Sequence, residues 1–284
     1  MAARSIEPSP AEARTTPCAQ ASRATVAVAG HAIGPSTFAI IAGPCSVITT
    51  GQTNRVAMSV RRAGAPIFRG GCYKPRSDPG SFQGLGARGL AMLAEAKLET
   101  GLPIVTELLD VRDLEAVLAV ADMIQVGARN MHNTGLLKAL GQTDRPVLLK
   151  RGLAATIDET IGAADYVRGA GNERVVLCER GIRTFETAYR FTLDLAAVPI
   201  LQERSGLPVI VDPSHAPGRR DLVTSLSKAA AAVGADGLIV EVDENPEFAR
   251  SDGPQQLASE DFAHYMVEVS RVALAEGRRV LEPW

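Results

Sequence analysis

Several features that would mark other classes of protein are scarce or absent in this sequence. Only 4% of the 284 residues are aromatic, which argues against a base-stacking surface for RNA and against an aromatic platform for carbohydrate. The formal net charge is −2, so the chain has no overall basic field that would attract nucleic acid. No apolar run approaches the length of a membrane span, and the N-terminus lacks the apolar stretch of a secretory signal. We therefore expect no nucleic-acid partner and no membrane association.

Cysteine is also scarce, and its spacing is uninformative for a disulfide framework. The four cysteines are Cys18, Cys45, Cys72 and Cys178, and no two of them form a Cys-x-x-Cys pair. Sparse, unpaired cysteines are typical of a reducing compartment, so we expect a cytoplasmic protein.

The sequence does contain a regular alternation of short apolar runs and longer amphipathic segments. The runs predicted as strands are 38–42, 66–69, 102–107, 123–126, 146–150, 174–178, 207–211 and 237–241. The segments predicted as helices are 53–63, 87–100, 111–120, 135–140, 157–169, 188–205, 221–233 and 259–276. Nearly continuous apolar strands indicate a parallel sheet buried on both faces. Eight such units in this length predict an α/β fold of the (β/α)₈ TIM-barrel type. The alternative is an open doubly wound sheet, which normally has fewer strands and a Gly-x-Gly-x-x-Gly turn after the first strand.

The N-terminal region differs from the rest of the chain. Residues 1–22 are small and polar and contain Pro, and we expect a flexible tail there. Residues 24–33 alternate around Gly30 and His31, which predicts a short β-hairpin with His31 in its turn. We expect residues 23–284 to form a single catalytic domain that includes this hairpin.

In a barrel of this kind, the active site lies at the carboxyl ends of the strands. Cationic side chains follow several of the predicted strands, namely Arg69, Lys74, Arg76, Arg129, Lys150 and Arg180. Gathering this many cations at one rim predicts a strongly anionic ligand such as a phosphate ester. The alternative is an ion-pair network with Glu107, Glu179 and Asp212.

A second group at the strand ends has the character of metal ligands. Cys45, His215, Glu241 and Asp252 offer one thiolate, one imidazole and two carboxylates, a plausible set for a divalent transition metal. Alternatively, Cys45 is a small buried apolar residue and Glu241 pairs with a barrel cation. Asp212, three residues before His215, is expected to orient that site or a bound water.

Short motifs throughout the chain resemble a known enzyme family. These motifs are Gly43-Pro-Cys-Ser46, Lys74-Pro-Arg-Ser77, Ser81-Phe-Gln-Gly-Leu-Gly86, Gly127-Ala-Arg-Asn130, Lys150-Arg-Gly152, Glu179-Arg-Gly-Ile-Arg-Thr-Phe-Glu186, Asp212-Pro-Ser-His215 and Ser251-Asp252. In this order, from about residue 38 to residue 277, they resemble the 3-deoxy-D-arabino-heptulosonate 7-phosphate (DAHP) synthase family, in particular its short type I beta form.

This resemblance implies a transferase that condenses phosphoenolpyruvate with erythrose 4-phosphate and releases phosphate, the first step of the shikimate pathway to aromatic amino acids. It implies a cofactor of one divalent metal ion, Mn²⁺, Fe²⁺, Co²⁺ or Zn²⁺, which polarises the aldehyde oxygen. The implied metal ligands are Cys45, His215, Glu241 and Asp252. The implied substrate-binding residues are Arg69, Lys74, Pro75, Arg76, Ser77, Gln125, Ala128, Arg129, Lys150 and Arg180. The implied catalytic residues are Lys74, as a proton donor whose pKa is lowered by nearby cations, His215 and Asp212. We expect a homo-oligomer, either a dimer or a tetramer.

The sequence departs from the family pattern at a few positions. Asp243 replaces the His of the usual Glu-Val-His segment, which adds a negative charge near the expected metal. Ser77 replaces a Thr, and His132-Asn133-Thr134 replaces Gln-Asn-Phe. These departures leave open a paralogue that uses another aldose phosphate. We also expect no additional regulatory domain and therefore no feedback control through one.

Three competing functions remain open. The sister enzyme 3-deoxy-D-manno-octulosonate 8-phosphate synthase uses arabinose 5-phosphate, but has Lys-Ala-Asn-Arg-Ser where this chain has Lys74-Pro-Arg-Ser77. A non-catalytic barrel would have no need of the intact cation and ligand sets. A Schiff-base aldolase built on Lys150 would work in the presence of chelator.

Overall fold

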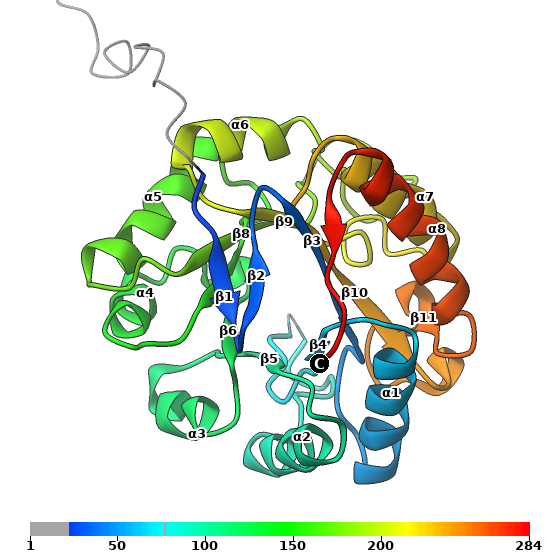
Figure 1. The fold of residues 1–284 in the computed structure, drawn as a ribbon. Coiled ribbons are helices and arrows are strands. Elements are labelled where there is room, and N and C mark those ends of the chain that lie inside the picture. The colour runs from blue at the N-terminus through cyan, green and yellow to red at the C-terminus, as the bar shows by residue number, and fades with distance from the viewer. Residues whose placement is uncertain (1–22, 77) are drawn as a thin grey trace, which may run out of the picture.

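Eight parallel strands close into a barrel in the computed structural model of this chain, which describes residues 23–76 and 78–284 (Figure 1). The barrel strands are β3 (Thr37–Gly43), β4 (Ile67–Arg69), β5 (Ile104–Glu107), β6 (Met123–Val126), β7 (Val147–Lys150), β8 (Val175–Glu179), β9 (Val209–Val211) and β10 (Gly237–Asp243). Each strand pairs in parallel with the next, and β10 pairs with β3 from Gly237–Ala39 to Glu241–Gly43. The predicted TIM-barrel fold is confirmed.

The barrel strands are fully buried because alternate side chains face two different apolar regions. In β3, Ala39 and Ile41 belong to the cluster inside the barrel, whereas Phe38 and Ile40 pack in the larger layer between strands and helices. This two-sided burial explains why the strands read as continuous apolar runs in the sequence.

The surrounding helices are α1 (Thr50–Arg62), α2 (Ala87–Thr100), α3 (Leu114–Leu118), α4 (Thr134–Gly141), α5 (Ile157–Gly169), α6 (Ala197–Ser205), α7 (Arg220–Ala232) and α8 (Phe262–Ala275). The predicted bounds of α2 and α5 match those observed. Thr156 and Glu159 form a capping box that fixes the start of α5.

The prediction of a helix from residue 188 is wrong, because α6 begins only at Ala197. Residues 180–196 instead form a long loop that folds back on itself, with a backbone bridge between Ile182 and Thr192.

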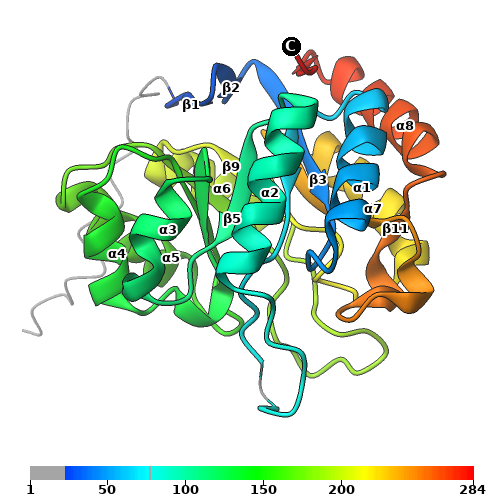
Figure 2. The ribbon, with the colours of Figure 1, turned by 90° about the horizontal axis from the view of Figure 1, so that it is seen from below.

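The predicted hairpin closes the end of the barrel at which the strands begin. Strands β1 (Val26–Val28) and β2 (His31–Ile33) pair antiparallel, and Val28 and Ile33 are buried in the same apolar cluster as the barrel interior. Figure 2 shows the hairpin and the C-terminus at one end of the barrel, with the long loops at the other. The placement of His31 in the turn is wrong: Ala29 and Gly30 have positive φ and make the turn. The His31 ring instead stacks on Trp284, with ring centroids 4.7 Å apart.

Two short strands extend the barrel sheet. Strand β11 (Leu257–Ala258) pairs in parallel with the end of β10, and β12 (Arg279–Val280) pairs in parallel with the start of β3. Neither was expected from the sequence, because each has only two residues.

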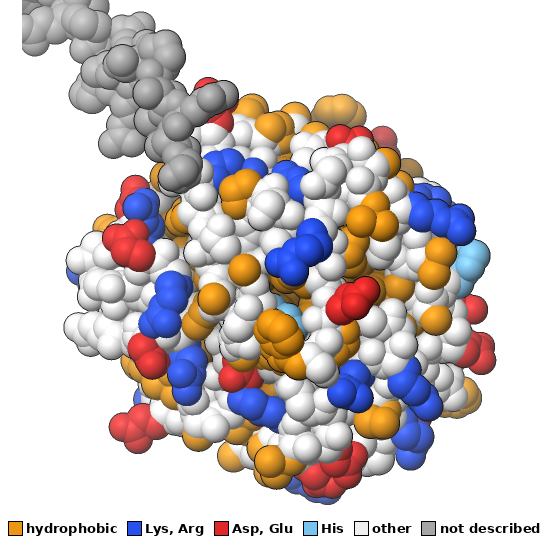
Figure 3. Space-filling view, viewed as in Figure 1, with side chains coloured by type: hydrophobic (Ala, Val, Ile, Leu, Met, Phe, Trp, Pro, Cys, Tyr) orange, Lys and Arg blue, Asp and Glu red, His pale blue; other side chains and the backbone are white. Residues whose placement is uncertain are grey.

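The expectations for the N-terminal tail and for one of the four cysteines concern residues that the structure does not describe. The predicted flexible tail of residues 1–22 lies outside the described ranges, as does Cys18. Cys45, Cys72 and Cys178 are buried free thiols. Within the described ranges, no helix has both the length and the apolar character needed to cross a bilayer. On the face that carries the hairpin, charged side chains of both signs are scattered among apolar and polar ones (Figure 3).

Candidate active site

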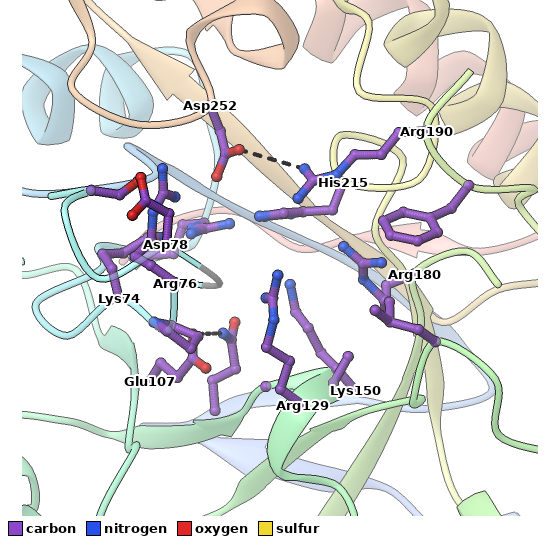
Figure 4. A pocket seen from close by; sticks show the side chains of 18 residues that line it. Lys74, Arg76, Asp78, Glu107, Arg129, Lys150, Arg180, Arg190, His215 and Asp252 are labelled. Atoms are coloured by element: carbon purple, nitrogen blue, oxygen red, sulfur yellow. Dashed lines mark hydrogen bonds and ion pairs between the residues drawn. The ribbon is translucent and has the colours of Figure 1, made fainter. Parts of the chain in front are cut away.

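A cavity of about 310 Å³ opens at the carboxyl ends of the barrel strands. Figure 4 shows side chains converging on it from several strands and loops: Arg129 and Lys150 point into it beside Arg180, with Lys74 across the cavity. Parallel strands in a closed barrel all end at the same rim, so residues far apart in the sequence meet there.

The predicted substrate-binding residues line this cavity, with one residue outside the described ranges. Those lining it are Arg69, Lys74, Pro75, Arg76, Gln125, Ala128, Arg129, Lys150 and Arg180. Ser77 lies outside the described residues. His215 and Asp252 of the predicted metal set also line the cavity, whereas Cys45, Glu241 and Asp212 lie buried around it.

The four predicted metal ligands come together in space. Cys45 follows β3, His215 follows β9, Glu241 lies in β10, and Asp252 lies in the loop after β10. One ligand atom of each lies within 4.8 Å of the others, so the group could hold a metal ion. The His215 Nε2 atom is 3.2 Å from Glu241 Oε1, and the Cys45 thiol donates to Asp252 Oδ2 at 3.1 Å.

The chemistry of this group fits a divalent transition metal. Burial raises the pKa of Glu241, but the neighbouring His215 and Arg69 outweigh burial and lower it overall. Among the described residues, Glu241 Oε1 accepts no well-aligned hydrogen bond, although Arg69 Nη1 and His215 Nε2 lie 3.3 and 3.2 Å away, so its lone pairs are available to a cation. A thiolate, an imidazole and two carboxylates suit Mn²⁺, Fe²⁺, Co²⁺ or Zn²⁺ better than a purely oxygen-seeking cation.

Asp212 holds two functional side chains from beneath the site. Its Oδ2 atom is 2.8 Å from His215 Nδ1 and accepts from Lys150 Nζ at 2.5 Å. Its Oδ1 atom accepts from the backbone N–H groups of Ser214 and His215. This arrangement fixes the His215 ring with Nε2 toward the other predicted ligands, as is usual for metal-bound histidines.

The Lys74 ammonium lies next to the predicted ligands. Its Nζ atom donates to Cys45 Sγ at 2.9 Å and to the Cys45 carbonyl at 3.1 Å. Burial lowers the pKa of Lys74, but the neighbouring Cys45 sulfur and Glu241 carboxylate outweigh burial and raise it overall. The expectation that neighbouring cations lower this pKa is therefore wrong, because anions lie closer to Lys74 than was expected from the sequence.

The cations divide into paired and unpaired groups. Lys150 pairs with Asp212, and Arg69 Nη1 lies 3.3 Å from Glu241. Among the described residues, Arg129 and Arg180 form no ion pair, and Arg180 Nη1 is buried without a hydrogen-bond partner. Burial lowers the pKa of Arg180. Ion pairing within the protein therefore does not explain all of the cations at the carboxyl ends of the strands. The guanidinium groups of Arg129 and Arg180 point into the cavity and are available to bind an anion.

Several residues of the cavity were not predicted, notably Asp78, Leu153, Arg190 and Phe191. Arg190 donates to Asp252 Oδ1 at 3.4 Å, and the Phe191 ring lies 4.7 Å from the Arg180 guanidinium. Both Arg190 and Phe191 fall in the segment that was wrongly predicted as helix. The alternation of larger apolar and polar residues from Tyr189 to Leu193 is typical of extended backbone and could have located them.

The unusual Asp243 does not face the cavity. Its side chain is buried at the end of β10, accepts from Gln52 Nε2 at 2.6 Å and from the backbone N–H of Asn245 at 3.0 Å. It is not one of the four clustered metal-ligating side chains. Asp243 thus connects β10 to α1 beside the site.

A closed parallel barrel with a cationic mouth and a buried thiol–imidazole–carboxylate group is the architecture of a phosphate-handling barrel enzyme. The sequence model of the DAHP synthetase I family matches residues 20–275. The chain belongs to this family.

Individual relatives agree with this assignment. A "Phospho-2-dehydro-3-deoxyheptonate aldolase" of Thermotoga maritima is 51% identical over 248 residues, covering 87% of this chain and 73% of the relative. A solved structure titled as a truncated form of the DAHP synthase of the same organism has a TM-score of 0.85 at 46% identity, covering 91% of this chain and 95% of that one. A "2-dehydro-3-deoxyphosphooctonate aldolase" of Syntrophobacter fumaroxidans is 32% identical and covers 82% of this chain and 86% of the relative.

Proposed function

We propose that this chain condenses phosphoenolpyruvate with erythrose 4-phosphate to give DAHP and inorganic phosphate. The observation that carries the proposal is the placement of four potential metal ligands directly beside a cavity lined by unpaired cations, in a member of the DAHP synthetase I family. The higher identity to the seven-carbon enzyme than to the eight-carbon enzyme favours erythrose 4-phosphate over arabinose 5-phosphate.

The cations of the cavity are proposed to bind and orient phosphoenolpyruvate. Arg129 and Arg180 point into the cavity and have no carboxylate partner within the described part of the chain, so they are available to a phosphate dianion. Lys150 and Arg69 lie at the same site, each held by a buried carboxylate. Holding both substrates in one orientation supplies much of the rate gain in a bimolecular condensation.

The proposed metal site would be formed by Cys45, His215, Glu241 and Asp252. A bound divalent ion would supply Lewis-acid polarisation of the aldehyde. C3 of phosphoenolpyruvate then forms a bond to the aldehyde carbon, and water adds at C2. Loss of phosphate by C–O cleavage leaves a ketone at C2.

Lys74 is proposed to give a proton to the new alkoxide. Its raised pKa keeps it protonated near neutral pH, and its Nζ atom lies 2.9 Å from the thiol of a proposed ligand. Asp212 is proposed to act through His215 and Lys150, which it holds in place. We further propose that residues 23–284 form one catalytic domain and that the chain forms a homo-oligomer.

The decisive experiment follows phosphoenolpyruvate consumption with a panel of aldose phosphates, with and without EDTA. We expect turnover with erythrose 4-phosphate, its loss in EDTA, and its recovery when Mn²⁺ is added. Undiminished turnover in EDTA would contradict the metal assignment and favour a Schiff base. A preference for arabinose 5-phosphate would assign the eight-carbon reaction instead. The absence of turnover with every aldehyde would favour a non-catalytic barrel.

A further inference from the structure

The two carboxylates of the proposed metal site are each held at one oxygen by a side chain that is not itself a proposed ligand. Glu241 Oε2 accepts from Gln255 Nε2 at 2.5 Å. Asp252 Oδ1 accepts from Arg190 Nη1 at 3.4 Å, a contact drawn as a dashed line in Figure 4. Gln255 and Arg190 therefore support Glu241 and Asp252 from outside the group of ligands.

The second oxygen of each carboxylate lies against the other proposed ligands. Glu241 Oε1 is 3.2 Å from His215 Nε2, and Asp252 Oδ2 is 3.1 Å from Cys45 Sγ. Each carboxylate thus has one oxygen occupied by a protein donor and one oxygen directed at the place where the four ligand atoms converge.

Gln255 and Arg190 are also joined to each other. Gln255 Oε1 accepts from Arg190 Nη1 at 3.2 Å, and the Gln255 side chain is buried. A guanidinium can only donate and a carboxylate can only accept, so the Gln255 amide must direct its oxygen at Arg190 and its NH₂ group at Glu241. Only a side chain with both a donor and an acceptor can connect this cation to this anion.

The backbone places the ligand and its supporting amide on one short segment. Asp252 has a φ of 51°, which is uncommon for a residue other than glycine. The short 3₁₀ helix η5 (Gly253–Gln255) follows directly, and the Gln255 N–H donates to the Asp252 carbonyl at 3.3 Å. Arg190 comes from the separate loop of residues 180–196, so two loops together hold the carboxylates.

We propose that Gln255 and Arg190 are positioning residues of the metal site, which hold one oxygen of Glu241 and one of Asp252 and leave the other oxygen of each for the ion. This inference rests on the proposed function, which places a divalent metal at these ligands. The terminal torsion of a glutamate has no sharply preferred angle, so a hydrogen bond to one oxygen is what fixes the direction of the other. Outer hydrogen bonds of this kind commonly orient metal ligands.

The first test measures the affinity of the full chain for Mn²⁺ by calorimetry, after removal of metal with EDTA and without substrates. Gln255→Met keeps the length of the side chain but removes both side-chain hydrogen bonds, and we expect the Kd for Mn²⁺ to rise about 10- to 100-fold. Gln255→Asn keeps the amide but is one methylene too short, and should show a loss in the same range. Gln142→Met, at an exposed glutamine, is the matched control and should leave the Kd unchanged.

The second test distinguishes orientation of the ligands from a general contribution to packing. The visible absorption of bound Co²⁺ depends on the number and arrangement of its ligands. At saturating Co²⁺ we expect the spectrum of Gln255→Met to differ from that of the wild type, because the Glu241 carboxylate is then free to turn. Arg190→Met should weaken Mn²⁺ binding less than Gln255→Met does, because the contact of Arg190 with Asp252 is longer.

The results separate this inference from the function on which it rests. An unchanged Kd in Gln255→Met, with a wild type that binds Mn²⁺, would overturn the positioning role alone. Weaker binding with an unchanged Co²⁺ spectrum would also overturn it, since that pattern indicates a loss of packing. A wild-type chain that binds neither metal would overturn the metal site of the proposed function together with this inference.

Discussion

At the scale of single residues, Asp212 shows how one buried carboxylate can position several functional groups. Burial raises its pKa, but the neighbouring His215 and Lys150 outweigh burial and hold the pKa well below its ordinary value. The carboxylate therefore stays ionised and keeps both partners in place. Because Asp212 touches neither solvent nor the cavity surface, its proposed effect is exerted through those partners.

Asp212→Asn is expected to weaken metal binding. The amide has the same size, but its NH₂ group cannot accept from both His215 and Lys150. Loss of such an orienting contact typically reduces metal affinity or activity about 10- to 100-fold. Titration of Mn²⁺ by calorimetry, alongside kcat, measures the effect. Asp221→Asn, an exposed control, should leave Mn²⁺ affinity unchanged, and an unaltered affinity in Asp212→Asn would refute the orienting role.

At the scale of secondary-structure elements, a buried side-chain contact connects α1 to β10. Gln52 donates to Asp243 at 2.6 Å and accepts from the backbone N–H of Ile48 at 3.1 Å. The loop between β3 and α1 carries Cys45, and β10 carries Glu241. The contact therefore stabilises the relative placement of two proposed ligands from outside the metal site.

Asp243→Ala should lower the free energy of unfolding by about 1–3 kcal/mol, because it leaves the buried Gln52 amide with only the long 3.5 Å contact to the Ser46 carbonyl. Urea denaturation followed by circular dichroism gives this value. Glu244→Ala is the matched control: Glu244 pairs with the exposed Arg55, so little change in stability is expected. Equal stabilities of Asp243→Ala and Glu244→Ala would show that the Gln52 contact is unimportant.

The sequence allowed the regular elements to be predicted because their signals are local. Strand β6 and helices α2 and α5 were predicted with their observed bounds, since apolar period and helix capping depend on neighbouring residues. In the loop before α6, the alternation from Tyr189 to Leu193 could have indicated extended backbone, but the course of the loop depends on distant contacts such as that of Arg190 with Asp252.

The candidate site could be predicted only after the barrel fold had been predicted, because the fold decides which strand ends meet. No short motif contains Cys45, His215, Glu241 and Asp252, and the barrel was needed to bring them together. The pKa direction of Lys74 was missed because it depends on which charges lie within a few ångströms, here Cys45 and Glu241. The Arg190–Gln255 contact likewise joins loops that lie far apart in the sequence.

At the scale of the whole molecule, the hairpin residues that stabilise the fold and the residues that line the cavity lie at opposite ends of the barrel. The hairpin covers the end at which strands begin, where Val28, Ile33 and Leu281 extend the interior apolar cluster. The cavity lies at the other end, where the strands finish. Changes at the hairpin should therefore alter stability without altering substrate binding.

Ile33→Ala is expected to destabilise the fold by about 2–5 kcal/mol, the usual cost of truncating a fully buried isoleucine. The KM values for both substrates should stay at wild-type levels, measured at a temperature where the variant is folded. Ala27→Ser, at the outward-facing position of the same hairpin, serves as the control for a surface change. A raised KM in the folded Ile33→Ala variant would argue against this separation.

The position of Trp284 has a practical consequence for handling the protein. This residue stacks on the hairpin at the closed end of the barrel, and its side chain is largely exposed. A solid support or a fluorescent carrier attached there would sit on the side opposite the mouth. Immobilised molecules would then all present the open end of the barrel to the passing solution.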